Sequence, residues 1–164
     1  MHILLKNKNT LFLDDFEFKC CVGVNGLTKN KNEGDKKTPI GIYSLGSLFY
    51  RKDRLGVINT KLKKKIITRS MGWCDDIKSL KYNKLIRISK KKIKHEKMYR
   101  NDKKYDLLIP IKYNMIKPIK NKGSAIFIHL TENYKPTAGC IALKKNDFLI
   151  LLKLINKKTK IKII

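Results

Sequence analysis

The stretch 123-GSAIFIHLTENYKPTAGCIAL-143 holds the two most informative side chains of this 164-residue chain. Its apolar run Ala125–Ile128 is typical of a short buried strand, and that strand ends at His129. A polar loop follows, and then a second apolar run, Ile141–Leu143, begins directly after Cys140. We therefore expect two short strands that present one histidine and one cysteine at their ends.

A cysteine beside a histidine is a common arrangement for nucleophilic catalysis. A thiol is a strong nucleophile only as the thiolate, and a nearby imidazole can take its proton. We therefore predict Cys140 as the nucleophile, with a lowered thiol pKa and fast alkylation, and His129 as the general base. Gly139 permits close backbone approach, and the amides of Gly139 and Cys140 could face a developing oxyanion.

The histidine, the loop and the segment Thr137-Ala138-Gly139-Cys140 resemble the catalytic motif of the L,D-transpeptidases, the YkuD-like catalytic domain family. Upstream, 34-GDKKTPIGIY-43 is similar to the TP-x-G-x-[FY] segment of that family. Two further stretches, 69-RSMGWCDD-76 and 95-HEKMY-99, are similar to a branch of short bacterial members. The resemblance covers nearly the whole chain.

This resemblance implies an acyl transfer on peptidoglycan stem peptides. Cys140 would attack the bond between the diamino acid at position three and D-alanine, which leaves a thioester. An amine acceptor would then give a cross-link, whereas water would give L,D-carboxypeptidase activity. Two features differ from the family pattern: many members carry arginine where this chain has Ala142, and the loop from His129 to Cys140 is shorter than the common spacing.

Other polar residues of these motifs are predicted to bind substrate. Arg69 could pair with a substrate carboxylate in place of the missing arginine, and Asp75 and Asp76 could bind an ammonium group. Stabilisation of a loop through surface pairs is the alternative role for such residues. The complete predicted set is Arg69, Trp73, Asp75, Asp76, His95 and Thr137.

The four cysteines indicate neither a disulfide framework nor a metal site. No CxxC pair occurs, and adjacent Cys20 and Cys21 would face opposite sides of a strand, where core packing is the expected role. Four residues could in principle bind zinc, but their spacing matches no familiar zinc site. They are Cys74, His95, His129 and Cys140. We expect neither a metal nor a cofactor.

The chain is strongly basic, with a formal net charge of +26. Most of this charge is lysine scattered along the sequence, which is typical of a solvated basic surface that attracts anionic ligands. The expected partner is a peptidoglycan stem peptide or muropeptide, and we expect no specific nucleic acid as a partner. The protein itself is expected to be a monomer. In the alternative reading, the chain is a non-enzymatic basic protein that binds nucleic acid or anionic surfaces. Its binding would then depend steeply on salt and would be unchanged by Cys140→Ala.

The chain length and the hydrophobic pattern favour one catalytic domain over residues 1–164. Strands are expected over 3–5 and 11–13 as a hairpin, and over 16–24, 41–50, 66–68, 105–111, 125–129 and 160–164. One helix is expected from an N-cap at Asn146 or Asp147 to about 156, one or two helical turns over 95–100, and irregular structure over 71–88. This content predicts an α+β, mostly β domain, which the family resemblance narrows to a mixed β-sandwich.

The N-terminus has no basic segment before a long apolar run. We find no signal peptide and no segment long enough to span a membrane. We therefore expect a cytoplasmic enzyme, or a periplasmic one if another route exports it.

Overall fold

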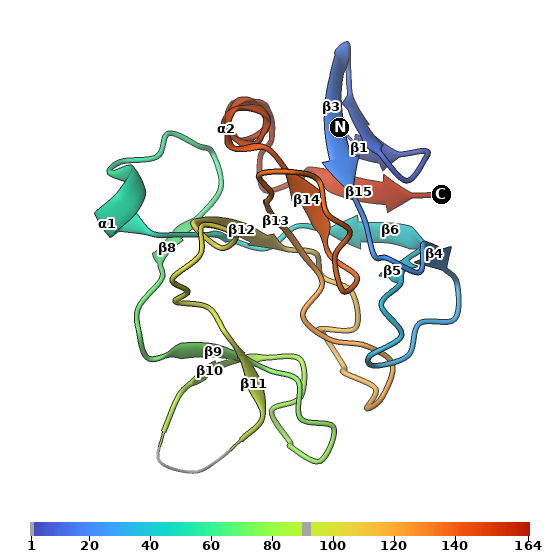
Figure 1. The fold of residues 1–164 in the computed structure, drawn as a ribbon, viewed down its shortest axis with the longest axis vertical. Coiled ribbons are helices and arrows are strands. Elements are labelled where there is room, and N and C mark those ends of the chain that lie inside the picture. Colours follow the sequence, from blue (N-terminus) through green and yellow to red (C-terminus); the bar gives the residue numbers. More distant parts are fainter. Residues whose placement is uncertain (1, 90–92) are drawn as a thin grey trace.

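The computed structural model of this protein describes residues 2–89 and 93–164. A ten-stranded mixed sheet dominates the fold, with the strand order β6-β15-β1-β2-β3-β14-β13-β12-β7-β8 (Figure 1). The strands of this sheet are β1 (His2–Leu5), β2 (Thr10–Leu13), β3 (Phe16–Cys21), β6 (Gly41–Ser44), β7 (Leu48–Tyr50), β8 (Lys64–Ile66), β12 (Leu107–Pro110), β13 (Phe127–Leu130), β14 (Ile141–Leu143) and β15 (Lys160–Ile163).

The sheet curls until its strands face each other, which gives the predicted mixed β-sandwich. A bridge between Leu45 and Ile111 joins the end of β6 to the end of β12, and the Lys112 amide donates to Ser44 O over 2.9 Å. The main apolar core fills the interior of this curl, with Ile3, Leu107 and Ile128 fully buried. The prediction of an α+β, mostly β fold is confirmed.

The N-terminal hairpin forms as its sequence predicts. In the turn between β1 and β2, Asn7 Oδ1 accepts hydrogen bonds from the Thr10 amide at 2.8 Å and the Asn9 amide at 3.2 Å. These bonds satisfy backbone donors that the two strands leave unpaired. β15 then pairs in parallel with β1, so the two ends of the chain share one sheet.

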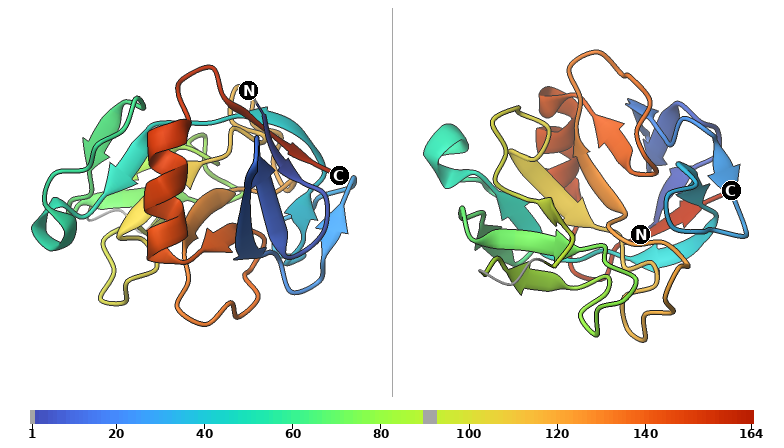
Figure 2. Two further views of the ribbon diagram at one scale, coloured as in Figure 1. Left: turned by 90° about the horizontal axis from the view of Figure 1, so that it is seen from above. Right: turned by 60° about the horizontal axis from the view of Figure 1, so that its bottom comes forward.

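The predicted C-terminal helix is α2 (Lys145–Leu154), which packs against the curled sheet (Figure 2). Its inner side buries Phe148, Leu151 and Leu152 in the main core. The expected N-cap is wrong: Lys144 holds that position, and no side chain caps the helix. Packing of the apolar side therefore fixes this helix, since a side-chain cap is absent. A second, short helix, α1 (Lys52–Leu55), was not predicted.

A small sheet lies beside the large one, in the order β10-β9-β11. Its strands are β9 (Met71–Cys74), β10 (Leu85–Arg87) and β11 (His95–Lys97), and a separate parallel pair consists of β4 (Leu27–Thr28) and β5 (Thr38–Pro39). The helical turns expected over 95–100 are wrong, because 95–97 pairs with β9. The irregular structure expected over 71–88 is wrong at both ends, which form β9 and β10. The strand expected over 66–68 lies earlier, at β8.

The central strands β12, β13 and β14 have two buried faces. Ile128, Leu130 and Ile141 project into the main core. The alternate residues Phe127 and Cys140 belong to a second apolar cluster, which includes Trp73 of the small sheet. Because side chains alternate along a strand, His129 and Ala142 share the face of Phe127 and Cys140. The central strands therefore carry the main core on one face and the candidate site on the other.

Candidate active site

The loop before Cys140 is fixed to the main sheet by backbone bonds. Thr137 forms a bridge with Gly23 just beyond β3, and its amide donates to Val22 O over 2.9 Å. The Thr137 hydroxyl donates to Cys140 O over 2.6 Å. These contacts fold the four-residue motif into a tight turn that delivers Cys140 at the start of β14.

A distant threonine also holds this turn. Thr38 of β5 is fully buried, and its hydroxyl donates to Gly139 O over 2.8 Å while it accepts the Gly23 amide over 2.9 Å. This link joins positions 101 residues apart in sequence. The threonine of the Thr-Pro segment therefore holds the backbone beside Cys140.

Gly139 is required by the backbone of this turn. Its φ is +135°, and a Cβ at this position would lie 2.8 Å from Lys37 O. The Gly139 amide donates to Thr137 Oγ1 over 3.0 Å. The expectation that this amide faces an oxyanion is therefore not met, and the Cys140 amide is the remaining candidate from the predicted pair.

The Cys140 thiol lies in an apolar environment. Its side chain belongs to the cluster of Trp73 and Phe127, and Sγ donates to Ala125 O over 3.2 Å and accepts the Phe127 amide over 3.4 Å. Burial, with the nearby Glu96 carboxylate, raises the pKa of the Cys140 thiol to about 12. The lowered thiol pKa expected from the sequence is therefore wrong for this structure, because desolvation disfavours the thiolate.

His129 stands on the same face, one strand away. The strand register pairs it with Ala142, two residues beyond Cys140. Nδ1 lies 2.8 Å from Leu130 O, which can only accept, so this nitrogen carries the proton and Nε2 is the basic one. Burial lowers the pKa of His129 to about 4, with Lys104 and Arg100 acting in the same direction. The imidazole is thus neutral near pH 7 and able to accept a proton.

Both side chains line a cleft with a volume of about 1420 Å³. Two alanines also line the cleft: Ala142 pairs with His129 in the strand register, and Ala125 O accepts the hydrogen bond from Cys140 Sγ. The acidic residues Glu33, Asp75 and Glu96 line the same cleft. The cleft is large enough for a peptide substrate, and it carries charged groups of both signs.

The structure brings only part of the predicted substrate-binding set into this cleft. Asp75, Asp76 and Thr137 line it with Cys140 and His129. Three other predicted residues lie elsewhere in the described structure. Arg69 is exposed and stacks on Tyr99 at 5.2 Å, Trp73 is buried with its indole nitrogen donating to Asn83, and His95 Nδ1 contacts Ile93 O.

Glu96 and Tyr105 are cleft residues that sequence reasoning did not select. The Tyr105 hydroxyl donates to the Glu96 carboxylate, and its ring lies edge-on to His129 with centroids 5.3 Å apart. Burial raises the pKa of Glu96. The missed signal was alternation: once 95–97 is a strand, His95 and Glu96 must point to opposite sides.

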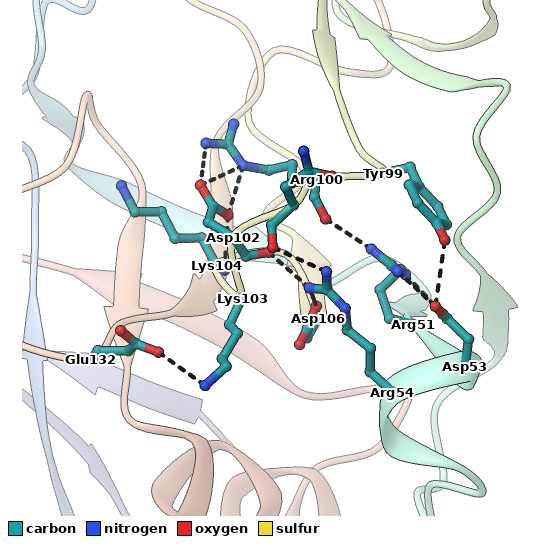
Figure 3. Close-up of polar contacts among 11 residues, drawn as sticks. Arg51, Asp53, Arg54, Tyr99, Arg100, Asp102, Lys103, Lys104, Asp106 and Glu132 are labelled. Atoms are coloured by element: carbon teal, nitrogen blue, oxygen red, sulfur yellow. Dashed lines mark hydrogen bonds and ion pairs between the residues drawn. The ribbon is translucent and has the colours of Figure 1, made fainter.

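A loop over residues 99–106 forms one side of the cleft, and two arginines from the α1 region fix it (Figure 3). Arg51 donates to Arg100 O over 2.8 Å, and Arg54 donates to the Asp106 carboxylate over 2.8 Å and to Asp102 O over 2.9 Å. These bonds hold the backbone of the loop. The outward side chains of the loop therefore lie at the rim of the cleft.

Within residues 2–89 and 93–164, no cluster of three or more histidine, cysteine or acidic side chains could hold a metal ion. None of the helices in that part of the chain is long and apolar enough to cross a membrane.

Comparison with known proteins agrees with this geometry. The family model described as the L,D-transpeptidase catalytic domain matches residues 3–163. Two crystal structures of the helical cell shape determining protein Pgp2 from Campylobacter jejuni, one of them the K307A mutant, match with a TM-score of 0.51. Their identities to this chain are 21% and 20% for wild type and mutant. The match covers 99% of this chain and 46% of each of those, so it spans less than half of their length. No curated protein matches.

Proposed function

Since this chain belongs to the L,D-transpeptidase catalytic domain family, we propose that it is a cysteine acyl-transfer enzyme that acts on peptidoglycan stem peptides. The observation that carries the proposal is the placement of Cys140 and His129 on one face of adjacent strands, in the wall of a large cleft. The family match supports the proposed reaction class, and the placement supports Cys140 as its nucleophile and His129 as its base.

The proposed reaction begins with both groups neutral. The thiol turns from Ala125 O toward the imidazole, and His129 Nε2 takes its proton as Sγ attacks the scissile carbonyl. The S–C bond forms, the C–N bond breaks, and His129 returns the proton to the departing amine. The Cys140 amide stabilises the oxyanion. Because the resting thiol is protonated, proton transfer accompanies attack instead of preceding it.

The acidic groups of the cleft fit the substrate of such a reaction. Asp75 Oδ1 is buried and has no hydrogen-bond partner among the described residues, and burial raises the pKa of Asp75. An ammonium group of a diamino acid would satisfy this oxygen, which supports the role predicted for Asp75 from the sequence. Glu96 lines the same cleft, and its negative charge helps to raise the pKa of the Cys140 thiol.

The acceptor decides between two activities of the proposed enzyme. Water would release a tripeptide and make the protein an L,D-carboxypeptidase suited to muropeptide recycling, whereas a second stem amine would give a cross-link. We propose hydrolysis as the principal outcome, and the products formed by the purified protein test it.

The test is mass spectrometry after incubation of purified protein with a disaccharide-tetrapeptide. Loss of one D-alanine without dimers is the expected result, and Cys140→Ala should give no product. Dimers joined between diamino acids would instead show transpeptidation. If wild type and Cys140→Ala both leave the substrate intact, the proposal fails.

The alternative of a non-enzymatic basic binder predicts a different result. Wild type and Cys140→Ala would then bind nucleic acid or anionic vesicles equally, with affinity falling steeply as salt rises. Parallel binding titrations of the two proteins separate this reading from catalysis.

A further inference from the structure

Two loops beyond the catalytic motif repeat the same short pattern of aliphatic residues and lysines. The segments are 77-IKSLK-81 and 116-IKPIK-120, and in each an aliphatic residue followed by lysine occurs twice. Each complete loop, over residues 77–84 or 115–122, contains three lysines and no acidic residue. We call these two ranges together the two-loop surface. The proposed reaction uses none of its side chains.

The aliphatic side chains of the two-loop surface are unusually exposed. Leu80 is 91% exposed, Ile116 is 87% exposed and Ile119 is 65% exposed, and Ile77 is exposed as well. Among the described residues, three of the four most exposed large apolar side chains therefore belong to this surface. Single exposed aliphatic residues are common on proteins, but several of them gathered on neighbouring loops mark a contact site.

The two loops lie side by side, although about forty residues separate them in the sequence. The Lys120 ammonium donates to Lys78 O over 3.3 Å, which joins the loops near their tips. At their bases, the side-chain amide of buried Asn83 donates to Tyr113 O over 3.0 Å and to Asn114 O over 2.7 Å. The right view of Figure 2 shows the green and orange loops next to each other at the bottom of the molecule.

Local hydrogen bonds hold both loops in shape. In the first loop, Asp76 Oδ1 accepts the Lys78 amide over 2.9 Å. In the second, Asn114 donates to Ile119 O over 2.9 Å and accepts the Ile119 amide over 2.8 Å. The aliphatic side chains are thus presented on ordered turns, so a partner that binds them would order little additional chain.

The lysines of the two-loop surface give it a uniform positive charge. All six are exposed, and the described residues provide none of them with an ion-pair partner. The nearest carboxylates in the sequence, Asp75 and Asp76, line the cleft instead, and Asp75 pairs with Lys94 at 3.7 Å. The partner of this surface should therefore be anionic.

The combination of lysine and aliphatic side chains favours a lipid bilayer over nucleic acid. Nucleic acid would contact the lysines and stack on aromatic rings, but the aromatic residue within these loops, Tyr82, is buried. A bilayer with anionic headgroups suits both kinds of side chain, because lysines contact the phosphates while aliphatic groups enter the boundary of the acyl chains. Each lysine near such a surface strengthens binding about fivefold.

We infer that the two-loop surface binds an anionic phospholipid bilayer, with Leu80, Ile116 and Ile119 inserted at the acyl boundary and the lysines on the headgroups. Ile77 and Asn121 also line the cleft, so a bilayer bound here lies beside the opening of the cleft. The inference does not rest on the proposed function, because the surface contains neither Cys140 nor His129.

The first test measures sedimentation of the purified protein with vesicles of phosphatidylcholine and phosphatidylglycerol in equal parts, and with vesicles of phosphatidylcholine alone. Wild type should bind the anionic vesicles and not the neutral ones. Leu80→Ser and Ile116→Ser should each weaken that binding at least about fivefold, because serine loses the favourable transfer of an apolar side chain. The matched control Val57→Ser removes a side chain that is 84% exposed just after α1, and it should leave binding unchanged.

The second test removes charge from the loops and from another basic segment. Lys81→Gln combined with Lys117→Gln should weaken binding to the anionic vesicles at least about tenfold. The matched control, Lys61→Gln combined with Lys63→Gln, lowers the net charge equally at exposed positions before β8, and its effect should stay below about twofold.

The third test detects insertion into the bilayer. The emission of Leu80→Trp should shift to the blue on addition of anionic vesicles, and lipids brominated on their acyl chains should quench it. Val57→Trp should show neither effect. Trp73 is buried and contributes the same background to every variant.

Three results would overturn the inference. The first is no binding of wild type to the anionic vesicles. The second is an equal loss of binding in the loop variants and their controls, which would indicate a general basic surface. The third is a loss in the lysine variant alone, with neither serine variant affected and no blue shift, which would indicate an electrostatic partner such as nucleic acid or an acidic protein.

Failure of this inference is distinguishable from failure of the proposed function. Cys140→Ala should bind anionic vesicles like wild type, because Cys140 lies outside the two-loop surface, and yet it should release no D-alanine. Vesicle binding that depends on Leu80 and Ile116 without release of D-alanine would support the surface and contradict the reaction. Release of D-alanine without vesicle binding would support the reaction and overturn the surface.

Discussion

At the scale of single residues, burial sets the chemistry of the candidate pair. Desolvation raises the pKa of Cys140 to about 12 and lowers the pKa of His129 to about 4, so both side chains are neutral over a wide pH range. A resting thiolate–imidazolium pair would need a more polar site. The structure therefore favours a protonated thiol and a neutral imidazole in the free protein.

We predict that alkylation of Cys140 by iodoacetamide in the free protein rises about tenfold per pH unit between pH 6 and pH 9. The reason is that the thiolate fraction grows in this way below a raised pKa. Rates measured on the Cys140 peptide check it, with denatured protein as the reference for a solvated thiol. A rate that levels off below pH 7 would instead reveal a preformed ion pair.

His129 also makes stability depend on pH. The unfolded chain binds a proton near pH 6.5, but the folded chain does so only near pH 4, so the unfolded state gains protons first as pH falls. The stability that the neutral imidazole contributes is complete above pH 6.5 and lost toward pH 4. The shift corresponds to about 3 kcal/mol.

Urea titrations of wild type and His129→Gln at several pH values check this prediction. The difference in the free energy of unfolding between the two proteins should be constant above pH 7 and should fall by about 3 kcal/mol at pH 4. Subtracting the variant removes the contribution of other titrating groups. If the free energies of unfolding of the two proteins changed in parallel over the whole pH range, the result would contradict a buried neutral imidazole.

At the scale of elements, the position of Cys140 depends on a contact between β5 and the turn before β14. Thr38 satisfies two buried backbone groups, the Gly139 carbonyl and the Gly23 amide. Neither group has another partner of comparable geometry in the described structure. The turn that presents Cys140 is therefore held by a residue 101 positions before Gly139 in the sequence.

Thr38→Val keeps the shape of the side chain and removes its hydroxyl, which leaves these two groups unpaired. We expect a loss of about 1–3 kcal/mol in the free energy of unfolding and a larger fall in kcat than a rise in KM. Thr38→Ser retains the hydroxyl and should keep most of the stability and most of the kcat of wild type. Equal behaviour of the two variants would show that the methyl group, and not the clamp, matters.

At the scale of the whole molecule, the net charge of +26 opposes compact folding. The largest group of ion pairs in the described structure involves the loop over 99–106. Most lysines remain on the surface with water as their partner. This excess charge attracts anionic molecules in general and does not set which of them binds.

We predict that raising NaCl from about 10 mM to about 150 mM increases the melting temperature, since the Debye length falls from about 30 Å to about 8 Å and screens the repulsion between lysines. Thermal unfolding followed by circular dichroism checks it, and Cys140→Ala should respond like wild type because the effect is global. A decrease in the melting temperature as NaCl rises would mean that the attraction within ion pairs outweighs the repulsion between lysines.

Local pattern in the sequence was sufficient for the elements whose signals are periodic. The alternation of 3–5 and 11–13 gave the hairpin, the apolar side of 148–155 gave α2, and the runs beside His129 and Cys140 gave two short strands. Alternation in β3 also predicted the opposite facing of Cys20 and Cys21, of which Cys20 lies in the main core. These features need only neighbours in the chain, so the sequence by itself determined them.

Tertiary structure alone decided which polar residues meet at the site. It turned Glu96 toward Tyr105 in the cleft and placed His95 on the other face, set Thr38 against Gly139, and left Arg69 outside the cleft. It also set the protonation of the pair, since burial depends on everything that packs around a group. Contacts between positions as far apart as 101 residues leave no periodic trace in the sequence, because they arise only when the sheet has curled.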